Sequence, residues 1–176
     1  MAQMGISCEI VASNADETAT GPACRQVKEL ARRKAVAVRG KISTDAVIIA
    51  ADTLVEIDGK ILAKPENADE AFAMLKSLQG RRHTVHTGVA LLKTGKTDQI
   101  VSFVDYAHVH FRSLTDAEIA AYVATGEPMD KAGAYGVQDR GAAFVARIEG
   151  DYYTVVGLPL SRLAKALADF GVDIWD

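Results

Sequence analysis

The sequence predicts an α/β protein whose mixed, elongated central sheet is flanked by helices. Patterns with a period of two residues alternate along the chain with patterns of 3.6, so strands and helices intermingle. Two pairs of strand patterns adjoin across short turns, and such hairpins exclude a purely parallel sheet. The 176 residues contain no linker or internal repeat, so we expect a single domain over residues 1–176.

The first part of the chain is expected to form a short strand and then a helix. Ile6, Cys8 and Ile10 alternate with polar residues, which is typical of a strand. Pro22 suits the first turn of a helix, and Gly40 suits the position after its end. A helix is therefore predicted between these two residues.

A buried strand and a tight hairpin are predicted next. The apolar run 47–51 is typical of a strand covered on both faces, and the strand pattern continues to Ile57. Asp58 and Gly59 then favour a two-residue hairpin turn. We therefore expect the chain to return in a second strand at Ile61.

Two further helices are indicated by capping signals. Asn67, with Glu70 three residues later, predicts a helix start, and Gly80 is suited to its end. Thr115 and Glu118 have the spacing of a second capping box. Two long strand patterns and a last amphipathic helix complete the predicted elements, at residues 83–92, 100–111 and 160–170.

Residues 127–143, EPMDKAGAYGVQDRGAA, follow neither period. A loop this long inside a compact domain is uncommon unless it has a function. Its glycines allow backbone N–H groups to approach an anion closely. We expect a binding loop here, the alternative being a floppy surface loop.

Composition and charge restrict the classes of protein. The 20 basic and 23 acidic residues give a net charge of −3, whereas proteins that grip nucleic-acid backbone are usually basic. No apolar run approaches the roughly 20 residues that cross a bilayer, and no secretory signal is visible. Neither a nucleic-acid nor a membrane partner is expected. Cys8 and Cys24 are expected to be reduced core thiols of a cytoplasmic protein, although a disulfide between them is an alternative.

Two charged residues lie where apolar ones are expected. Asp52 follows the buried run 47–51, where an ionised carboxylate is unfavourable unless it is paired or bound to a metal. It is also placed near the carboxyl end of a strand, where ligands of α/β proteins gather. Lys34 falls at the centre of the apolar stripe of the first helix. The structural alternatives are a turn cap or ion pair for Asp52, and a side chain that snorkels to water for Lys34.

Three lysines would suit a polyphosphate if they converged on Asp52. Lys64 precedes Pro65, so its backbone should be extended, and Lys131 lies in the patternless stretch. Together with Lys34 they would supply point charges around a carboxylate that holds a divalent ion or orients water. Taken singly, each lysine is more often a solvated side chain.

Other catalytic motifs find no support. His83 and His86 should face opposite sides of a strand, while His108 and His110 share a face without a third ligand at a zinc spacing. The sequence has no nucleophile elbow, dinucleotide fingerprint or P-loop.

Four segments in order carry a resemblance to a known family. AADTLVEIDGKILAKP, GRRHTVHTGVAL, TGEPMDKAGAYGVQ and IEGDYYTVVGLPL together resemble the Maf family of nucleotide pyrophosphatases, over nearly the whole chain. The resemblance implies a Maf/ITPase-like fold, often a homodimer. It also implies hydrolysis of a nucleoside triphosphate between the α and β phosphates with a divalent cation, Mg²⁺ or Mn²⁺.

The resemblance also assigns roles to residues of this chain. Asp52 matches the general base, and Lys34 and Lys64 match lysines at the phosphates. Glu17 matches an acidic position near them, which makes Asp52 and Glu17 the candidate metal ligands. Lys131 is kept as a further candidate contact of the substrate.

Substrate preference and departures from the family pattern come from other positions. Thr53 and Gln138 match the subfamily that acts on dTTP and UTP, and modified pyrimidine nucleotides are a further expectation. Ala63 and Asp139 stand where the family has glycines. The sequence given starts after the family's first strand and its Ser-Pro-Arg-Arg turn, so that strand is expected to be missing from the sheet. The alternatives are an inactive nucleotide-binding or cell-division regulatory protein of the same fold, and a pyrophosphatase with another base preference.

Overall fold

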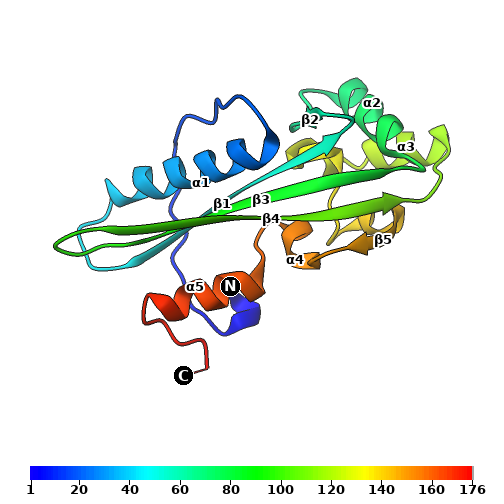
Figure 1. Cartoon of the computed structure of the whole chain (residues 1–176). Coiled ribbons are helices and arrows are strands. Elements are labelled where there is room, and N and C mark those ends of the chain that lie inside the picture. The colour runs from blue at the N-terminus through cyan, green and yellow to red at the C-terminus, as the bar shows by residue number, and fades with distance from the viewer. Residues whose placement is uncertain (176) are drawn as a thin grey trace. The chain divides into compact units, whose positions relative to one another are not determined.

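The protein, as seen in a computed structural model that describes residues 1–175, is built around a five-stranded sheet in the order β2-β1-β3-β4-β5 (Figure 1). The pairs β1/β2 and β4/β5 are antiparallel. Helices flank the strands, so the expected α/β class is confirmed. The strands are β1 Val47–Ile57, β2 Lys60–Leu62, β3 Arg82–Lys93, β4 Gln99–Phe111 and β5 Val145–Glu149.

Contacts divide the chain into two compact units. Unit 1 contains residues 1–52, residues 87–105 and the chain from residue 158 onward, whereas unit 2 contains residues 53–86 and 106–157. The helices are α1 Ala23–Arg39, α2 Ala68–Leu78, α3 Asp116–Val123, α4 Tyr152–Val156 and α5 Leu160–Asp169, with 3₁₀ turns η1 Ala2–Met4, η2 Glu127–Asp130, η3 Ala132–Ala134 and η4 Arg140–Phe144. None of the helices within residues 1–175 is both long and apolar enough to span a bilayer.

The predicted turn and caps are confirmed. Asp58 and Gly59 both have positive φ, at 51° and 73°, which are the values that a tight two-residue hairpin needs. The side chain of Asn67 accepts a hydrogen bond from the backbone N–H of Glu70, at 2.9 Å. The capping box at Thr115 is complete, because its hydroxyl and the Glu118 carboxylate each accept a hydrogen bond from the other residue's backbone N–H.

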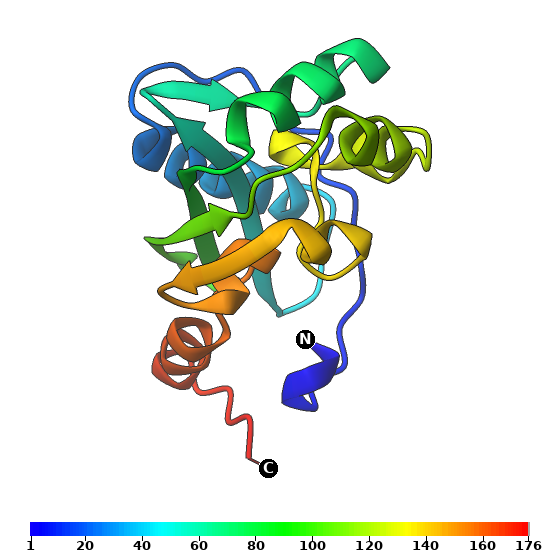
Figure 2. The same ribbon diagram turned by 90° about the vertical axis from the view of Figure 1, so that its right-hand side faces the viewer.

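The expected N-terminal strand is wrong. Residues 6–20 form neither helix nor strand, and Figure 2 shows them as a plain trace. The alternation of apolar residues there does not correspond to a buried face, since Ile10 is 94% exposed. Cys8 and Cys24 are free thiols, as expected, but both are exposed, so the prediction that they are core residues is wrong.

Unit 2 has an aromatic core beside its part of the sheet. Tyr135, Phe111 and Phe144 belong to one buried cluster, and the rings of Phe111 and Tyr135 meet edge-to-face with centroids 4.7 Å apart. The buried His83 donates to or accepts from the Tyr135 hydroxyl, at 2.8 Å. Residues 132–136 lie within or against this cluster, so the middle of the patternless stretch is packed and is not floppy.

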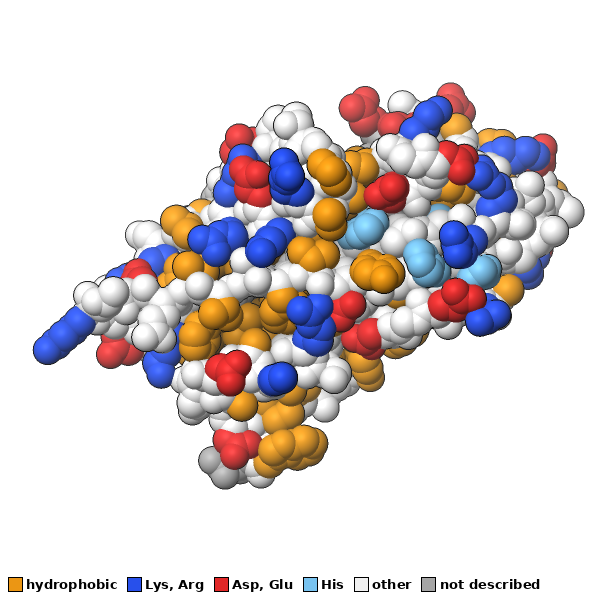
Figure 3. Space-filling view, in the orientation of Figure 1, with side chains coloured by type: hydrophobic (Ala, Val, Ile, Leu, Met, Phe, Trp, Pro, Cys, Tyr) orange, Lys and Arg blue, Asp and Glu red, His pale blue; other side chains and the backbone are white. Residues whose placement is uncertain are grey.

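The other face of the same strands carries polar side chains. Nε2 of His86 lies 3.3 Å from Glu56, and Nε2 of His110 lies 3.3 Å from Glu149. Figure 3 shows histidine side chains gathered on the visible surface beside acidic and basic ones. His83 and His86 therefore face opposite sides of β3, as predicted.

In unit 1, helices cover both faces of the strands (Figure 1). Ile48 and Ala90 pack with α1, whereas Ile49 and Val89 pack with α5. The expectation that the run 47–51 is covered on both faces is therefore confirmed. α1 approaches β3 so closely that a Cβ placed on Gly88 would lie 2.3 Å from the carbonyl oxygen of Val27.

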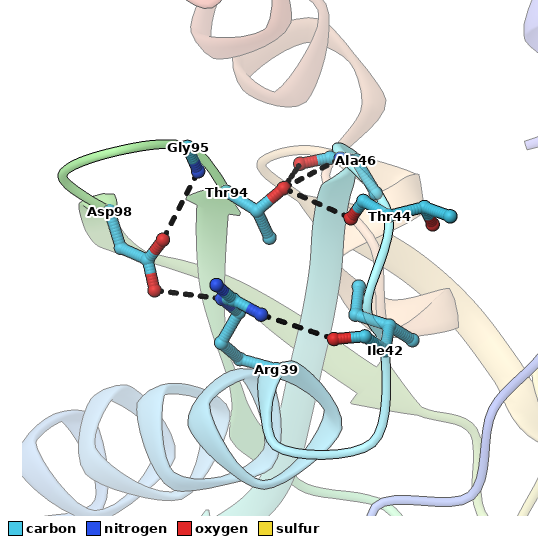
Figure 4. Close-up of polar contacts among 7 residues, drawn as sticks. All are labelled: Arg39, Ile42, Thr44, Ala46, Thr94, Gly95 and Asp98. Atoms are coloured by element: carbon cyan, nitrogen blue, oxygen red, sulfur yellow. Dashed lines mark hydrogen bonds and ion pairs between the residues drawn. The ribbon is translucent and has the colours of Figure 1, made fainter.

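The C-terminal end of α1 is tied to the β3–β4 turn and to the loop before β1 (Figure 4). Arg39 donates to Asp98 at 2.8 Å and to the carbonyl of Ile42 at 3.1 Å. The Thr94 hydroxyl accepts from the backbone N–H of Ala46 at 2.7 Å. The two bonds of Arg39 hold the C-terminal end of α1, the helix that also carries Lys34.

Candidate active site

The candidate site in unit 1 is centred on Asp52. This residue lies in the middle of β1, so its expected place at the carboxyl end of a strand is wrong. Its side chain is only 10% exposed, and its Oδ1 lies 2.6 Å from Nζ of Lys34 on α1. A short, charge-assisted hydrogen bond of this kind stabilises an ionised carboxylate that is otherwise costly to bury.

Lys34 joins two carboxylates. Its Nζ also lies 3.0 Å from Oε1 of Glu17, a residue of the N-terminal segment. Burial alone would lower the pKa of Lys34, but the hydrogen bonds and charges of Asp52 and Glu17 together outweigh it, so its pKa is raised. Lys34 is therefore a permanent cation at neutral pH, and it does not snorkel past its neighbours into solvent.

The alternation of β1 explains why these two residues meet. Even-numbered side chains of the strand face α1, because Ile48 and Ala50 pack with the buried residues of that helix. Asp52 continues this series, and Lys34 lies in the apolar stripe of α1, next to buried Ala35. The two departures from hydrophobic patterning thus face each other.

The segment that carries Glu17 is held by the residue before Lys34. Arg33 donates a hydrogen bond to the carbonyl oxygen of Thr18 at 2.6 Å, and its Nη1 lies 3.9 Å from Oδ2 of Asp16. Two consecutive side chains of α1 therefore hold three consecutive residues of the segment. Sequence reasoning gave Arg33 no role, and its position beside Lys34 was the only signal.

Two predicted lysines lie in unit 2. Lys64 follows β2 and is exposed, while Nζ of Lys131 lies 2.7 Å from Asp130. The pKa of Asp130 is lowered chiefly by its hydrogen bond from Lys131, and the charge of Lys64 lowers it further. Lys64 and Lys131 thus act on one carboxylate, and the roles predicted for them at the phosphates stay predictions.

Thr53 and Gln138, the predicted base-selecting residues, also belong to unit 2. Thr53 follows Asp52 and leaves β1 on the opposite face, because successive side chains alternate. The Thr53 hydroxyl packs closely against Gly157, because a Cβ added to that glycine would lie 3.2 Å from Oγ1 of Thr53. Gln138 is exposed, between η3 and η4. The sequence did not indicate a role for Tyr122 or Glu127, whose side chains accept hydrogen bonds from backbone N–H groups on either side of Gln138.

The carboxylates suit a divalent cation only in combination with a substrate. Among residues 1–175 no three His, Cys, Asp or Glu side chains are grouped as metal ligands. Mg²⁺, however, commonly uses one or two carboxylates together with substrate phosphates and water. Asp52 and Glu17 both lie within 3.0 Å of the Lys34 ammonium, so the two carboxylates predicted as metal ligands are close to each other.

Comparison with known proteins shows similarity along nearly the whole chain. The family described as Maf-like protein matches residues 1–170. A protein of Moorella thermoacetica named dTTP/UTP pyrophosphatase is 49% identical, over 99% of this chain and 90% of its own length. Proteins with the same name from Pelotomaculum thermopropionicum and from Clostridium perfringens strain SM101 are 48% and 46% identical, over 98% and 94% of this chain and 90% and 88% of their own lengths.

Proposed function

The chain belongs to the Maf family, and we propose that it is a nucleoside triphosphate pyrophosphatase acting on dTTP and UTP. The reaction is hydrolysis of the α–β phosphoanhydride, which yields the nucleoside monophosphate and pyrophosphate. The observation that carries the proposal is the pair formed by Asp52 and Lys34, a shielded carboxylate joined to a cation at 2.6 Å. The shared name of the relatives supports the choice of nucleotides.

Asp52 is proposed as the general base of this reaction. A carboxylate that stays ionised in a partly buried site is suited to orient the attacking water and accept its proton. Lys34 pairs with that carboxylate at 2.6 Å and is proposed to supply a fixed positive charge near the bond that breaks. Such preorganised charge stabilises the negative charge that develops on the leaving pyrophosphate.

A divalent cation, Mg²⁺ or Mn²⁺, is proposed to bind with the nucleotide at Asp52 and Glu17. When bound, it would neutralise phosphate charge and assist departure of pyrophosphate. Lys64 and Lys131 are proposed to contact phosphate oxygens, while Thr53 and Gln138 are proposed to select the pyrimidine base. The roles of Lys64, Thr53 and Gln138 rest on the family resemblance, and that of Lys131 rests on its charge and its place in the stretch 127–143.

We further propose that residues 1–176 act as one enzymatic domain, in a cytoplasmic homodimer. The match over residues 1–170 supports the single domain, since one family pattern covers both units. The free thiols of Cys8 and Cys24 are consistent with a reducing compartment. Light scattering of the purified chain measures the oligomeric state.

A panel of nucleoside triphosphates, assayed for pyrophosphate with Mg²⁺ or Mn²⁺, tests the function. We expect the highest kcat/KM with dTTP and UTP and no orthophosphate as a direct product. Binding of dTTP without release of pyrophosphate would identify an inactive nucleotide-binding protein. A higher kcat/KM with a purine nucleotide would show another base preference.

A further inference from the structure

The carboxylate of Glu127 links the two ends of the irregular stretch between α3 and β5. Oε1 of Glu127 accepts hydrogen bonds from the Tyr122 hydroxyl, at 2.8 Å, and from the backbone N–H of Gly141, at 3.1 Å. Its Oε2 accepts from the backbone N–H of Arg140 at 3.3 Å. A side chain at the start of the stretch thus holds the backbone 13 and 14 residues later.

Tyr122 fixes the middle of the same stretch. Its hydroxyl oxygen accepts a hydrogen bond from the backbone N–H of Gly136 at 3.2 Å, while its proton goes to Glu127. Burial, and then the hydrogen bond to Glu127, raises the pKa of the Tyr122 phenol, so the hydroxyl keeps its proton at neutral pH. The ring is 5% exposed and meets Phe144 edge-to-face, with centroids 4.9 Å apart.

Close packing leaves this arrangement little freedom. A Cβ on Gly141 would lie 2.7 Å from the carbonyl oxygen of Gly136 and 2.8 Å from the Tyr122 hydroxyl oxygen. A Cβ on Gly136 would lie 3.1 Å from Cε of Lys131. The first half of the stretch is also anchored, because the N–H of Gly133 donates to the carbonyl of Ala63 at 3.1 Å.

Gln138 lies between the two anchored points. Gly136, two residues before it, is held by Tyr122, and Arg140, two residues after it, is held by Glu127. Gln138 itself is exposed, so the backbone on either side sets where its amide is presented.

We propose that Glu127 and Tyr122 are positioning residues that fix the place of Gln138 and thereby set the enzyme's preference among nucleotide bases. The proposal rests on the proposed pyrophosphatase function, in which Gln138 selects the base. A hydrogen-bonding site discriminates only if its donor and acceptor are held in place, and small displacements weaken transition-state contacts strongly.

Two conservative variants test the proposal. Glu127→Gln replaces one oxygen by an NH₂ group, which cannot accept from a backbone N–H. Tyr122→Phe removes the hydroxyl and keeps the ring against Phe144. Glu149→Gln and Tyr106→Phe, which change the same groups elsewhere in unit 2, are the matched controls.

The measurement is the ratio of kcat/KM for dTTP to that for dCTP. We expect each variant to lower this ratio about 10-fold or more, mainly through a higher KM for dTTP, while the controls leave it unchanged. A merely structural role would reduce kcat/KM for both nucleotides alike, and that result would overturn the proposal. In Gln138→Ala, adding Glu127→Gln should lower the ratio no further, because both changes remove the same discrimination.

Amide hydrogen exchange gives a readout that does not depend on activity. The N–H of Gly136 should exchange faster in Tyr122→Phe, and that of Arg140 in Glu127→Gln, with urea unfolding midpoints showing that both variants are folded. Unchanged exchange at these amides overturns the positioning role. If the parent chain releases no pyrophosphate, the proposed function fails. The positioning role is then tested by binding, as a loss of preference for dTTP over dCTP in the ratio of dissociation constants of each variant. An unchanged ratio, or no binding of either nucleotide, overturns it.

Discussion

The ammonium nitrogen of Lys34 lies 2.6 Å from a carboxylate oxygen of Asp52, where the apolar stripe of α1 meets the face of β1 that carries Ile48 and Ala50. Neither charge would be stable there alone, since an unpaired buried charge is strongly destabilising. Each charge therefore depends on the other at this place in the fold.

Replacing Asp52 by Asn should abolish most turnover. The amide keeps the size of the side chain but cannot accept the proton of the attacking water, so we expect kcat for dTTP to fall about 100-fold or more. Pyrophosphate release measures the effect. Asp58→Asn, at an exposed turn position that asparagine tolerates, is the control and should keep the parent rate. Parental turnover in Asp52→Asn would falsify the assignment of the general base.

Replacing Lys34 by Met should lower turnover strongly. The change removes the ammonium that ion-pairs with both Asp52 and Glu17 and that is proposed to stabilise the leaving pyrophosphate, so we expect kcat/KM for dTTP to fall about 100-fold or more. Pyrophosphate release measures the effect. Lys28→Met, at an exposed position of the same helix, should keep the parent rate. Parental kcat/KM in Lys34→Met would contradict a role of this ammonium in the reaction.

Gly88→Ala should destabilise the protein strongly. The added methyl group would meet the backbone of Val27 at 2.3 Å, so α1 has to move away from β3. We expect the free energy of unfolding to fall by about 2–3 kcal/mol or more in a urea titration. Gly95→Ala, where the nearest atom is 3.9 Å from the new Cβ, should change it by less than about 0.5 kcal/mol. Equal effects of the two substitutions would be the contrary result.

Stability should fall between pH 6.5 and 4 because of His83. Burial, with a smaller contribution from His110, lowers its pKa from 6.5 to about 4. Within this window the unfolded chain binds a proton that the folded chain does not, so the free energy of unfolding decreases as the pH falls, by about 3 kcal/mol in total. Urea unfolding over this range is the measurement. His83→Gln should lack this part of the pH dependence, and an identical dependence in both proteins would show that another group is responsible.

The elements with local signals were predictable from the sequence. Asn67, Thr115 and the Asp58–Gly59 turn each act through bonds or dihedral angles within a few residues, so pattern and structure agree there. The structure of residues 6–13 was not predictable, because alternating apolar residues do not show whether a neighbouring strand exists to pair with them. β5 and α4 carry no distinct pattern, being five residues each.

The candidate site was predictable in part for the same reason. Asp52 and Lys34 broke a hydrophobic pattern, and a broken pattern is visible in a single sequence. Their contact with Glu17 depends on how the N-terminal segment crosses α1, which no spacing encodes. Glu127 and Tyr122 act over 13 or 14 residues of irregular chain, so only the structure shows what they hold.

The two acids that meet Lys34 differ in how their backbones are supported. Asp52 lies in the middle of β1, so the strand sets the direction of its side chain, whereas Glu17 lies on irregular chain that is held through the side chains of Arg33 and Lys34. A change in β1 would thus displace Asp52, whereas the loss of a side-chain contact would release Glu17. The position of the proposed general base therefore depends on the sheet, and that of the second acid depends on the two cations of α1.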